Sequence, residues 1–198
     1  MYRLFYNEKV TGDILYAVLN SEEKPSRIEK KGNVAAIYQG DELIGINFFE
    51  ASKLARLPSA GILYAPKDEL IDALNKAIAA VGLAPLAYTR NSGFHVAKIF
   101  ALEEHPLDEK AQIVTLGLGE KKMTTVSWYA NLAVGDFVVV ALDGTILRDG
   151  SVFHQFVSRN IPNEVSLMDA KELGLPESQG AYHPTGLAEG ADFFLGER

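Results

Sequence analysis

Apolar residues in the first half of the chain form short runs that are separated by turn residues. Gly12-Asp13, Gly40-Asp41 and a charged stretch over residues 22–31 lie between these runs. Short apolar runs bounded by Gly and Asp are typical of antiparallel strands joined by turns. The pattern therefore predicts a small meander of strands at residues 4–6, 14–19, 34–38 and 43–49.

A helical pattern follows Pro66. Its apolar residues fall on one face of a helix, and Gly82 then supplies a stop because glycine readily takes the conformation that ends a helix. The sequence thus predicts an α+β domain over residues 1–88, a polar connector, and a second domain within residues 89–198. The apolar residues of the predicted helix are Leu70, Ile71, Leu74, Ile78 and Val81.

The second half changes character and becomes rich in β-forming residues. Short strands at close, regular spacing, joined by turns that contain Gly or Asp, are typical of a small barrel. One short helix is predicted near residues 166–173, with Ser166 as its N-cap and Gly174 at its end. The predicted strands lie at residues 94–102, 112–118, 123–128 and 137–142.

Charge is distributed unevenly between the two halves. Residues 1–93 carry 11 Lys and Arg against 11 Asp and Glu, whereas residues 94–198 carry 8 against 15 and hold the whole formal charge of −7. Dedicated nucleic-acid binders usually have a basic surface, because neutralising phosphates supplies much of their affinity. A few cations gathered on one face can still outweigh distant carboxylates, since charges are screened beyond about 8 to 10 Å.

Several classes of protein are not expected. The chain has no cysteine and no apolar run of the roughly 18 residues that a membrane span requires, and its first residues do not resemble a secretory signal, so we expect a cytoplasmic protein without disulfides. The four histidines lack the spacing of a metal site, and no nucleophile or phosphate-loop motif is present. We therefore expect no enzyme, metal or cofactor.

Short motifs in both halves carry a resemblance to a known family. The second half contains HPLDEK at 105–110, WYANL at 128–132, GDFVVVALDG at 135–144, RNIP at 159–162 and KELGLP at 171–176. In that order they resemble the tRNA-binding module with an OB-fold (oligonucleotide-binding barrel) found beside phenylalanyl- and methionyl-tRNA synthetases. In the first half, LFYN at 4–7, GD at 12–13 and INFFEAS at 46–52 look like the small domain that precedes this module in YtpR-type bacterial proteins.

The resemblance implies an α+β domain followed by an all-β OB-fold, a five-stranded barrel with a small C-terminal extension. It also implies binding of tRNA or another structured RNA and assembly as a homodimer. By position, Lys110, Asn131 and Arg159 match residues of the module, and Lys98 is a further candidate cation. For each residue a structural role stays open: a solvated lysine, an amide that satisfies a turn, or an ordinary salt bridge.

Other features favour a different interpretation. Trp128 replaces a glycine of the family, and Glu164 and Asp169 bring carboxylates into a segment where the family has serines. The aromatic residues Trp128, Tyr129, Phe153, His154 and Phe156 could stack on bases, although core packing is the commoner role and exposed rings would favour a dimer interface. The alternative hypothesis is therefore a protein-interaction or dimerisation module whose OB-fold has lost nucleic-acid binding.

Overall fold

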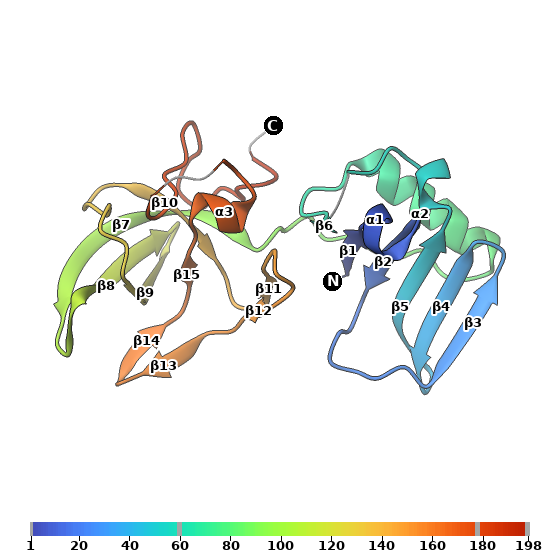
Figure 1. The fold of residues 1–198 in the computed structure, drawn as a ribbon, viewed down its shortest axis with the longest axis horizontal. Coiled ribbons are helices and arrows are strands. Elements are labelled where there is room, and N and C mark those ends of the chain that lie inside the picture. The colour runs from blue at the N-terminus through green and yellow to red at the C-terminus, as the bar shows by residue number, and fades with distance from the viewer. Residues whose placement is uncertain (1, 59–60, 177–178, 197–198) are drawn as a thin grey trace. The chain divides into compact units, whose positions relative to one another are not determined.

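The computed structural model describes residues 2–58, 61–176 and 179–196, and the chain divides into two compact units (Figure 1). The first unit runs through Arg90, and the second begins at Asn91. Each unit has its own cluster of buried apolar residues. Each cluster is built from residues of one unit alone, which is why the chain divides at this point.

An antiparallel six-stranded sheet forms the first unit, together with one long helix, α2 (Asp68–Ala80). Two shorter helical segments are α1 (Glu8–Thr11) and the 3-10 turn η1 (Ala51–Lys53). In hydrogen-bonded order the strands are β3 (Arg27–Lys31), β4 (Val34–Gln39), β5 (Glu42–Phe49), β2 (Ile14–Val18), β1 (Arg3–Tyr6) and β6 (Gly61–Ile62). The first unit is therefore α+β.

One face of this sheet holds the core. Leu4, Leu15 and Phe48 are almost completely buried on that face, and the apolar face of α2 joins the same cluster. Leu70, Ile71, Leu74 and Ile78 are the buried residues of α2, so the helix predicted from apolar spacing is confirmed. Within the sheet, alternate residues point to the opposite face.

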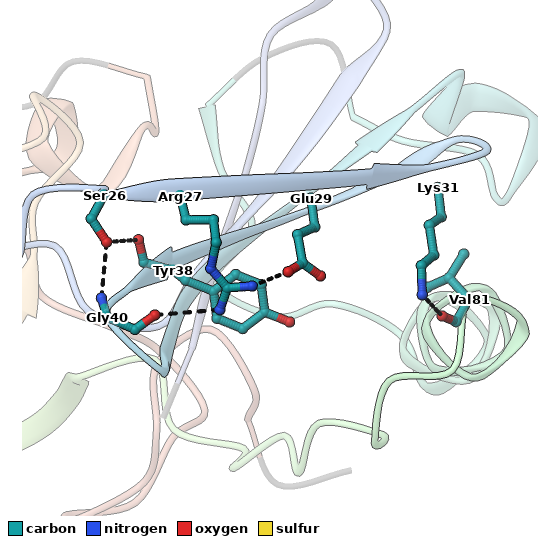
Figure 2. A network of polar contacts seen from close by, with 7 residues as sticks. All are labelled: Ser26, Arg27, Glu29, Lys31, Tyr38, Gly40 and Val81. Atoms are coloured by element: carbon teal, nitrogen blue, oxygen red, sulfur yellow. Dashed lines mark hydrogen bonds and ion pairs between the residues drawn. The ribbon is translucent and has the colours of Figure 1, made fainter.

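The edge strand β3 was not predicted, because all five of its residues are exposed and it has no apolar alternation. Polar contacts of its side chains hold it in place (Figure 2). The Arg27 guanidinium lies 4.3 Å from the Tyr38 ring centroid and donates to the Gly40 carbonyl oxygen at 3.3 Å. Lys31 Nζ donates to the Val81 carbonyl oxygen at 3.4 Å, at the end of α2. Charged side chains on an edge strand also discourage pairing with other chains.

The second unit is built on a five-stranded sheet with the order β15-β10-β7-β8-β9. Two short hairpins and one short helix, α3 (Ala170–Leu173), accompany it. The strands of the sheet are β15 (Ser166–Leu167), β10 (Phe137–Ala141), β7 (Phe94–His105), β8 (Asp108–Leu118) and β9 (Lys121–Ser127). The hairpins pair β11 (Thr145–Ile146) with β12 (Val152–Phe153), and β13 (Phe156–Ser158) with β14 (Ile161–Asn163). The unit is thus mostly β.

The strand ladder is open, and β9 and β15 do not pair among the described residues. Hydrogen bonds to the segment 163–165 bridge the two edges instead. The Glu164 backbone N–H donates to the Thr124 carbonyl oxygen at 2.9 Å, and Thr125 Oγ1 donates to the Val165 carbonyl oxygen at 2.7 Å. A closed five-stranded ladder was expected, and the difference arises because β15 has only two residues and cannot extend along β9.

The short helix lies later than predicted. Ser166 and Leu167 are both paired with β10, so the residue after Ser166 is extended and no helix begins there. Asp169 is the N-cap of α3, where it accepts the Glu172 N–H at 2.8 Å while the Glu172 carboxylate accepts the Asp169 N–H at 2.8 Å. This reciprocal pair is a capping box. The predicted stop is confirmed, because Gly174 takes a left-handed conformation with φ of 75°.

A C-terminal extension pairs with the first part of β7 through an isolated antiparallel bridge between His95 and Asp192. The Val96 N–H donates to the Ala191 carbonyl oxygen at 2.9 Å, and the Gly190 N–H donates to the Val96 carbonyl oxygen at 2.8 Å. The Phe94 and Phe194 rings meet edge to face with centroids 5.3 Å apart. Within the described part of the chain, no helix is long and apolar enough to cross a membrane.

We predict that Asp13 stabilises the first unit in a pH-dependent way. Its carboxylate accepts the Ser52 hydroxyl at 2.6 Å, the Ser52 N–H at 2.8 Å and the Tyr6 hydroxyl at 3.0 Å. The Ser52 hydroxyl contributes most to lowering the pKa of Asp13. The stabilisation is therefore present above the unfolded-state pKa of about 3.9 and is lost as pH falls through the lower folded-state value.

Asp13→Asn should accordingly lower the melting temperature of the first unit at neutral pH. It should also reduce the further loss of stability between about pH 5 and pH 2. Calorimetry over this pH range measures both effects, with Asp41→Asn in an exposed turn as the control. A wild type and an Asp13→Asn variant with parallel pH profiles would contradict this role.

Candidate nucleic-acid interface

A groove of about 660 Å³ opens in the second unit. Four parts of the fold supply its lining: the β7–β8 turn, the end of β9, the β12 to β14 segment, and β15 with α3. Figure 1 labels these elements. The bridge between β9 and residues 163–165 forms part of its floor, because Thr125, Asn163 and Val165 belong to the lining. Its remaining lining residues are His105, Asp108, Val126, Ser127, Trp128, Tyr129, Phe153, Phe156, Ser158, Arg159, Ser166, Leu167 and Glu172.

Trp128 presents an exposed and anchored ring in this groove. Trp128 is 64% exposed, although its indole Nε1–H donates to Asp108 Oδ2 at 3.0 Å. Asp108 also accepts the Lys110 N–H at 3.0 Å. These hydrogen bonds, the one from Trp128 first, hold the pKa of Asp108 below its usual value, so the acceptor stays ionised. One edge of the indole is fixed while much of its surface is available to a ligand.

Phe156 and Arg159 lie in the β13–β14 hairpin and also line the groove. Phe156 is 54% exposed. Arg159 and Asn160 form the two-residue turn with φ of 51° and 64°, which is the pattern of a type I′ hairpin. The Asn163 side chain fixes the hairpin beside β9, since its Oδ1 accepts the Val126 N–H at 3.0 Å. A cation and an exposed ring are thus attached to the same supported hairpin.

The acidic residues around the groove have identifiable partners. Glu164 Oε2 accepts the Thr124 N–H at 2.7 Å, and Asp169 caps α3, so both carboxylates support the fold. Neither residue belongs to the groove lining, whereas Asp108 and Glu172 do. Burial raises the pKa of the Glu172 carboxyl above its usual value. Burial also raises the pKa of the Tyr129 hydroxyl to about 12, and the nearby Glu172 and Asp169 carboxylates add to this shift.

Of the four residues predicted from the sequence, only Arg159 lines the groove. Lys110 is exposed on β8, two residues after the groove-lining Asp108. Lys98 lies elsewhere, on the sheet face opposite the core residues Ala97 and Ile99. The structure therefore does not gather the predicted cations at one place.

Lys98 is instead part of a separate patch with Lys122. The residues Phe137, Lys98, Gly117 and Lys122 are paired in one row across β10, β7, β8 and β9. Lys98 Nζ lies 5.9 Å from the Phe100 and Phe137 ring centroids, and Lys122 Nζ lies 5.7 Å from the Phe100 centroid. Both ammonium groups thus flank one partly exposed ring.

The Asn131 amide is engaged with the backbone. Its Nδ2 donates to the Ala181 carbonyl oxygen at 2.9 Å, and its Oδ1 accepts the Ala181 N–H at 2.8 Å. The Asn131 carbonyl oxygen is also 3.1 Å from His183 Nε2. These contacts hold the segment that follows α3, so the structure favours the positioning role over contact with a base.

The aromatic residues are where sequence reasoning was least successful. Core packing was the favoured role for the rings, but Trp128, His154 and Phe156 are exposed and Tyr129 and Phe153 are half-buried. The position of Trp128 directly after the end of β9 was the available signal that its ring is exposed. Among the described residues, no group of His, Asp and Glu is arranged to bind a metal.

Comparisons with known proteins agree with the motifs. Residues 21–86 match the domain of unknown function DUF4479. The "Putative tRNA-binding protein YtpR" of Bacillus subtilis (strain 168) is 28% identical over 178 residues, which are 88% of each chain. A phenylalanine–tRNA ligase β subunit of Leptospira biflexa serovar Patoc (strain Patoc 1 / Ames) is 32% identical over 116 residues, which are 58% of this chain and 14% of that subunit.

These similarities confirm the resemblance to YtpR-type proteins, which extends over nearly the entire chain. The chain spans only about a tenth to a seventh of the ligase β subunits that it matches, 10% and 14% in two of them. A crystal structure of a MetRS related protein from Pyrococcus horikoshii covers 50% of this chain and 85% of its own, with 13% identity and a TM-score of 0.35.

We predict that Asn131 stabilises the fold rather than contacting RNA. Asn131→Ala leaves a backbone N–H and a carbonyl oxygen of the buried Ala181 without their partners and should lower the free energy of unfolding by about 1 to 3 kcal/mol. Urea denaturation followed by the fluorescence of the single tryptophan measures the loss. Unchanged stability with weakened RNA binding would reverse this assignment.

Proposed function

We propose that the second unit is a non-catalytic RNA-binding module that accepts unpaired nucleotides of tRNA in the groove. The observation that carries this proposal is the exposed Trp128 ring, held at its edge by Asp108 in a groove that also contains Phe156 and Arg159. The names of the relatives support tRNA as the partner. Single-strand binders use exposed aromatic rings of this kind as surfaces on which bases stack.

Three side chains have complementary roles in this proposal. Trp128 and Phe156 offer ring surfaces to bases, and each stacked base is worth about 1 to 3 kcal/mol. The Arg159 guanidinium provides a planar donor for a phosphate oxygen, or a surface on which a base stacks. Lys110 follows the groove-lining Asp108 by two residues in the sequence. We propose it as a further phosphate contact.

We further propose that the second unit is an OB-fold. The hydrogen bonds from residues 163–165 to β9 support this assignment, because they join the two edges of the five-stranded sheet around a single core. OB-folds bind oligonucleotides across one face and its neighbouring loops. The groove has the corresponding composition, with edge-strand residues and hairpin loops in its lining.

The affinity should be weak and sensitive to salt. Residues 94–198 carry a formal charge of −7, and Arg159 is the single Lys or Arg in the groove lining. Few phosphates can therefore be neutralised, and long-range attraction is unfavourable. Stacking has to supply a larger share of the binding free energy than in a basic RNA-binding protein.

Exposed apolar residues in the hairpins favour a second candidate function. Val157, next to Phe156 in β13, is 70% exposed, and Val152 in β12 is 38% exposed. Apolar patches of this kind mark protein interfaces, so a homodimer or a protein-interaction module is the alternative. Sedimentation over a range of protein concentrations, with and without tRNA, separates assembly from RNA binding.

We predict that Arg159→Gln weakens tRNA binding and reduces its salt dependence. Loss of one phosphate contact should reduce the magnitude of the slope of log affinity against log salt by about 0.7 to 0.9. Mobility-shift titrations at several salt concentrations measure the slope. Arg148→Gln is the matched control, because Arg148 is an exposed arginine of the same unit outside the groove lining.

Trp128→Leu should weaken binding about fivefold to more than a hundredfold while leaving the salt slope unchanged. Leucine keeps an apolar side chain but removes the ring. The substitution also removes the hydrogen bond to Asp108, and thermal denaturation measures whether this lowers the stability of the protein. Equal affinities for the wild type, Trp128→Leu and Arg159→Gln would remove the groove as the RNA site. A wild type that binds no tRNA even at low salt would favour the protein-interaction alternative.

A further inference from the structure

The C-terminal extension places a carboxylate against the end of β8. The Val96 N–H donates to the Ala191 carbonyl oxygen at 2.9 Å, on the part of the β7 edge that precedes the first pairing of β7 with β8 at Lys98. This contact brings Glu189 to the β8–β9 turn, where its Oε1 accepts the Gly119 N–H at 3.1 Å. The extension therefore holds an anionic oxygen against the backbone of the turn.

The Glu189 carboxylate lies on the surface formed by Lys98, Phe100, Gly117 and Lys122, which we call the lysine patch. Gly117 on β8 pairs with Lys98 on one side and with Lys122 on the other, and paired residues point to the same face. A Cβ atom on Gly117 would lie 2.6 Å from Glu189 Oε1 and would overlap the Phe100 ring. The carboxylate and the ring thus lie over Gly117, on the face of both lysines.

The lysine patch has the donors that bind a phosphate group. Ammonium groups and the backbone N–H groups of turns are typical ligands of phosphate oxygens. Lys98 Nζ and Lys122 Nζ lie 5.9 and 5.7 Å from the Phe100 ring centroid, so both ammonium groups are near the same point. In the part of the chain that the structure describes, neither lysine forms an ion pair. The anionic oxygen held at this point belongs to Glu189.

Other carboxylates surround the lysine patch, so its preference for an anion depends on position and not on net charge. Glu120 is exposed in the turn, next to Gly119. Glu103 is paired four residues farther along β8 than the patch, about 14 Å away and beyond the screening length of about 8 to 10 Å. Glu164 and Asp136 each accept a backbone N–H elsewhere. Glu189, by contrast, enters the patch itself.

We propose that the lysine patch is a phosphate subsite for the tRNA backbone and that Glu189 occupies it as an internal competitor. This inference rests on the proposed RNA-binding function of the second unit. The Glu189 oxygen takes the position in which a phosphate oxygen would accept the Gly119 N–H. Once the Glu189 side chain moves away, Lys98 and Lys122 can neutralise a phosphate. The extension therefore lowers the affinity of the second unit for RNA.

The test compares Glu189→Gln with Glu120→Gln in the full chain. Each substitution removes one negative charge beside Gly119, but the Glu189 side chain is the one that accepts its N–H. Binding of tRNA is measured by mobility-shift titrations at several salt concentrations. Glu189→Gln should bind about two- to fivefold more tightly than the wild type at low salt. Glu120→Gln should change the affinity about 1.5-fold or less.

Substitutions of the lysines form the second arm of the test. With Glu189 in place, Lys98→Gln and Lys122→Gln should leave the salt slope unchanged, because the carboxylate occupies the subsite. In the Glu189→Gln background, each should reduce the magnitude of the slope by about 0.7 to 0.9 and abolish the gain in affinity. Lys121→Gln is the matched control in both backgrounds, because Lys121 is one residue away and lies on the other face of the sheet.

Inorganic phosphate separates the RNA backbone from a free anion. The amide signal of Gly119 in isotope-labelled Glu189→Gln is followed by nuclear magnetic resonance while phosphate alone is added. A saturable shift of this signal, with equal tRNA affinities for Glu189→Gln and the wild type, would assign the subsite to a small anion and contradict the proposal. A gain in tRNA affinity that phosphate competes away would support it.

Three further results would overturn the proposal: equal gains from Glu189→Gln and Glu120→Gln, lysine effects that are the same in both backgrounds, or no tRNA binding by either the wild type or Glu189→Gln. Thermal denaturation confirms that each variant is folded. Failure of the groove is distinguishable, since Trp128→Leu would then leave the affinity unchanged while the Glu189 and lysine effects persist. If the subsite alone fails, Trp128→Leu still weakens binding.

Discussion

The hydrogen bonds between β9 and residues 163–165 are the interaction on which the second unit depends. They satisfy exposed backbone groups of an edge strand and connect the two ends of an open ladder around one core. The same contacts bring the β13–β14 hairpin beside the end of β9. The groove, lined by Trp128 after β9 and by Phe156 and Arg159 of the β13–β14 hairpin, is a consequence of that junction.

This junction changes the meaning of the unit's negative charge. Glu164 and Asp169 count against RNA binding when charges are only summed, but Glu164 accepts a β9 amide and Asp169 caps α3. Asp108 in turn anchors the Trp128 indole. Carboxylates with these partners support the surface that contains Arg159. The local arrangement of donors and acceptors is therefore more informative than the net charge.

Elements with a strong apolar period were predictable, and elements held by polar contacts were not. The helix α2 follows from the spacing of Leu70 to Ile78, whereas β3 has no apolar signal and depends on contacts of Arg27 and Lys31. Serine is a residue type that often caps helices, but Ser166 pairs with β10 in a strand instead. The site was only partly predictable, because motif positions do not show which way a side chain points.

The most direct measurement is the nuclear magnetic resonance signal of the Trp128 indole N–H, which is unique because the chain has one tryptophan. In a titration of the isotope-labelled protein with tRNA, this signal should shift or broaden together with the backbone amides of residues 153–159. Formation of a protein–tRNA complex with the indole signal and these amides unchanged would contradict an RNA site in the groove.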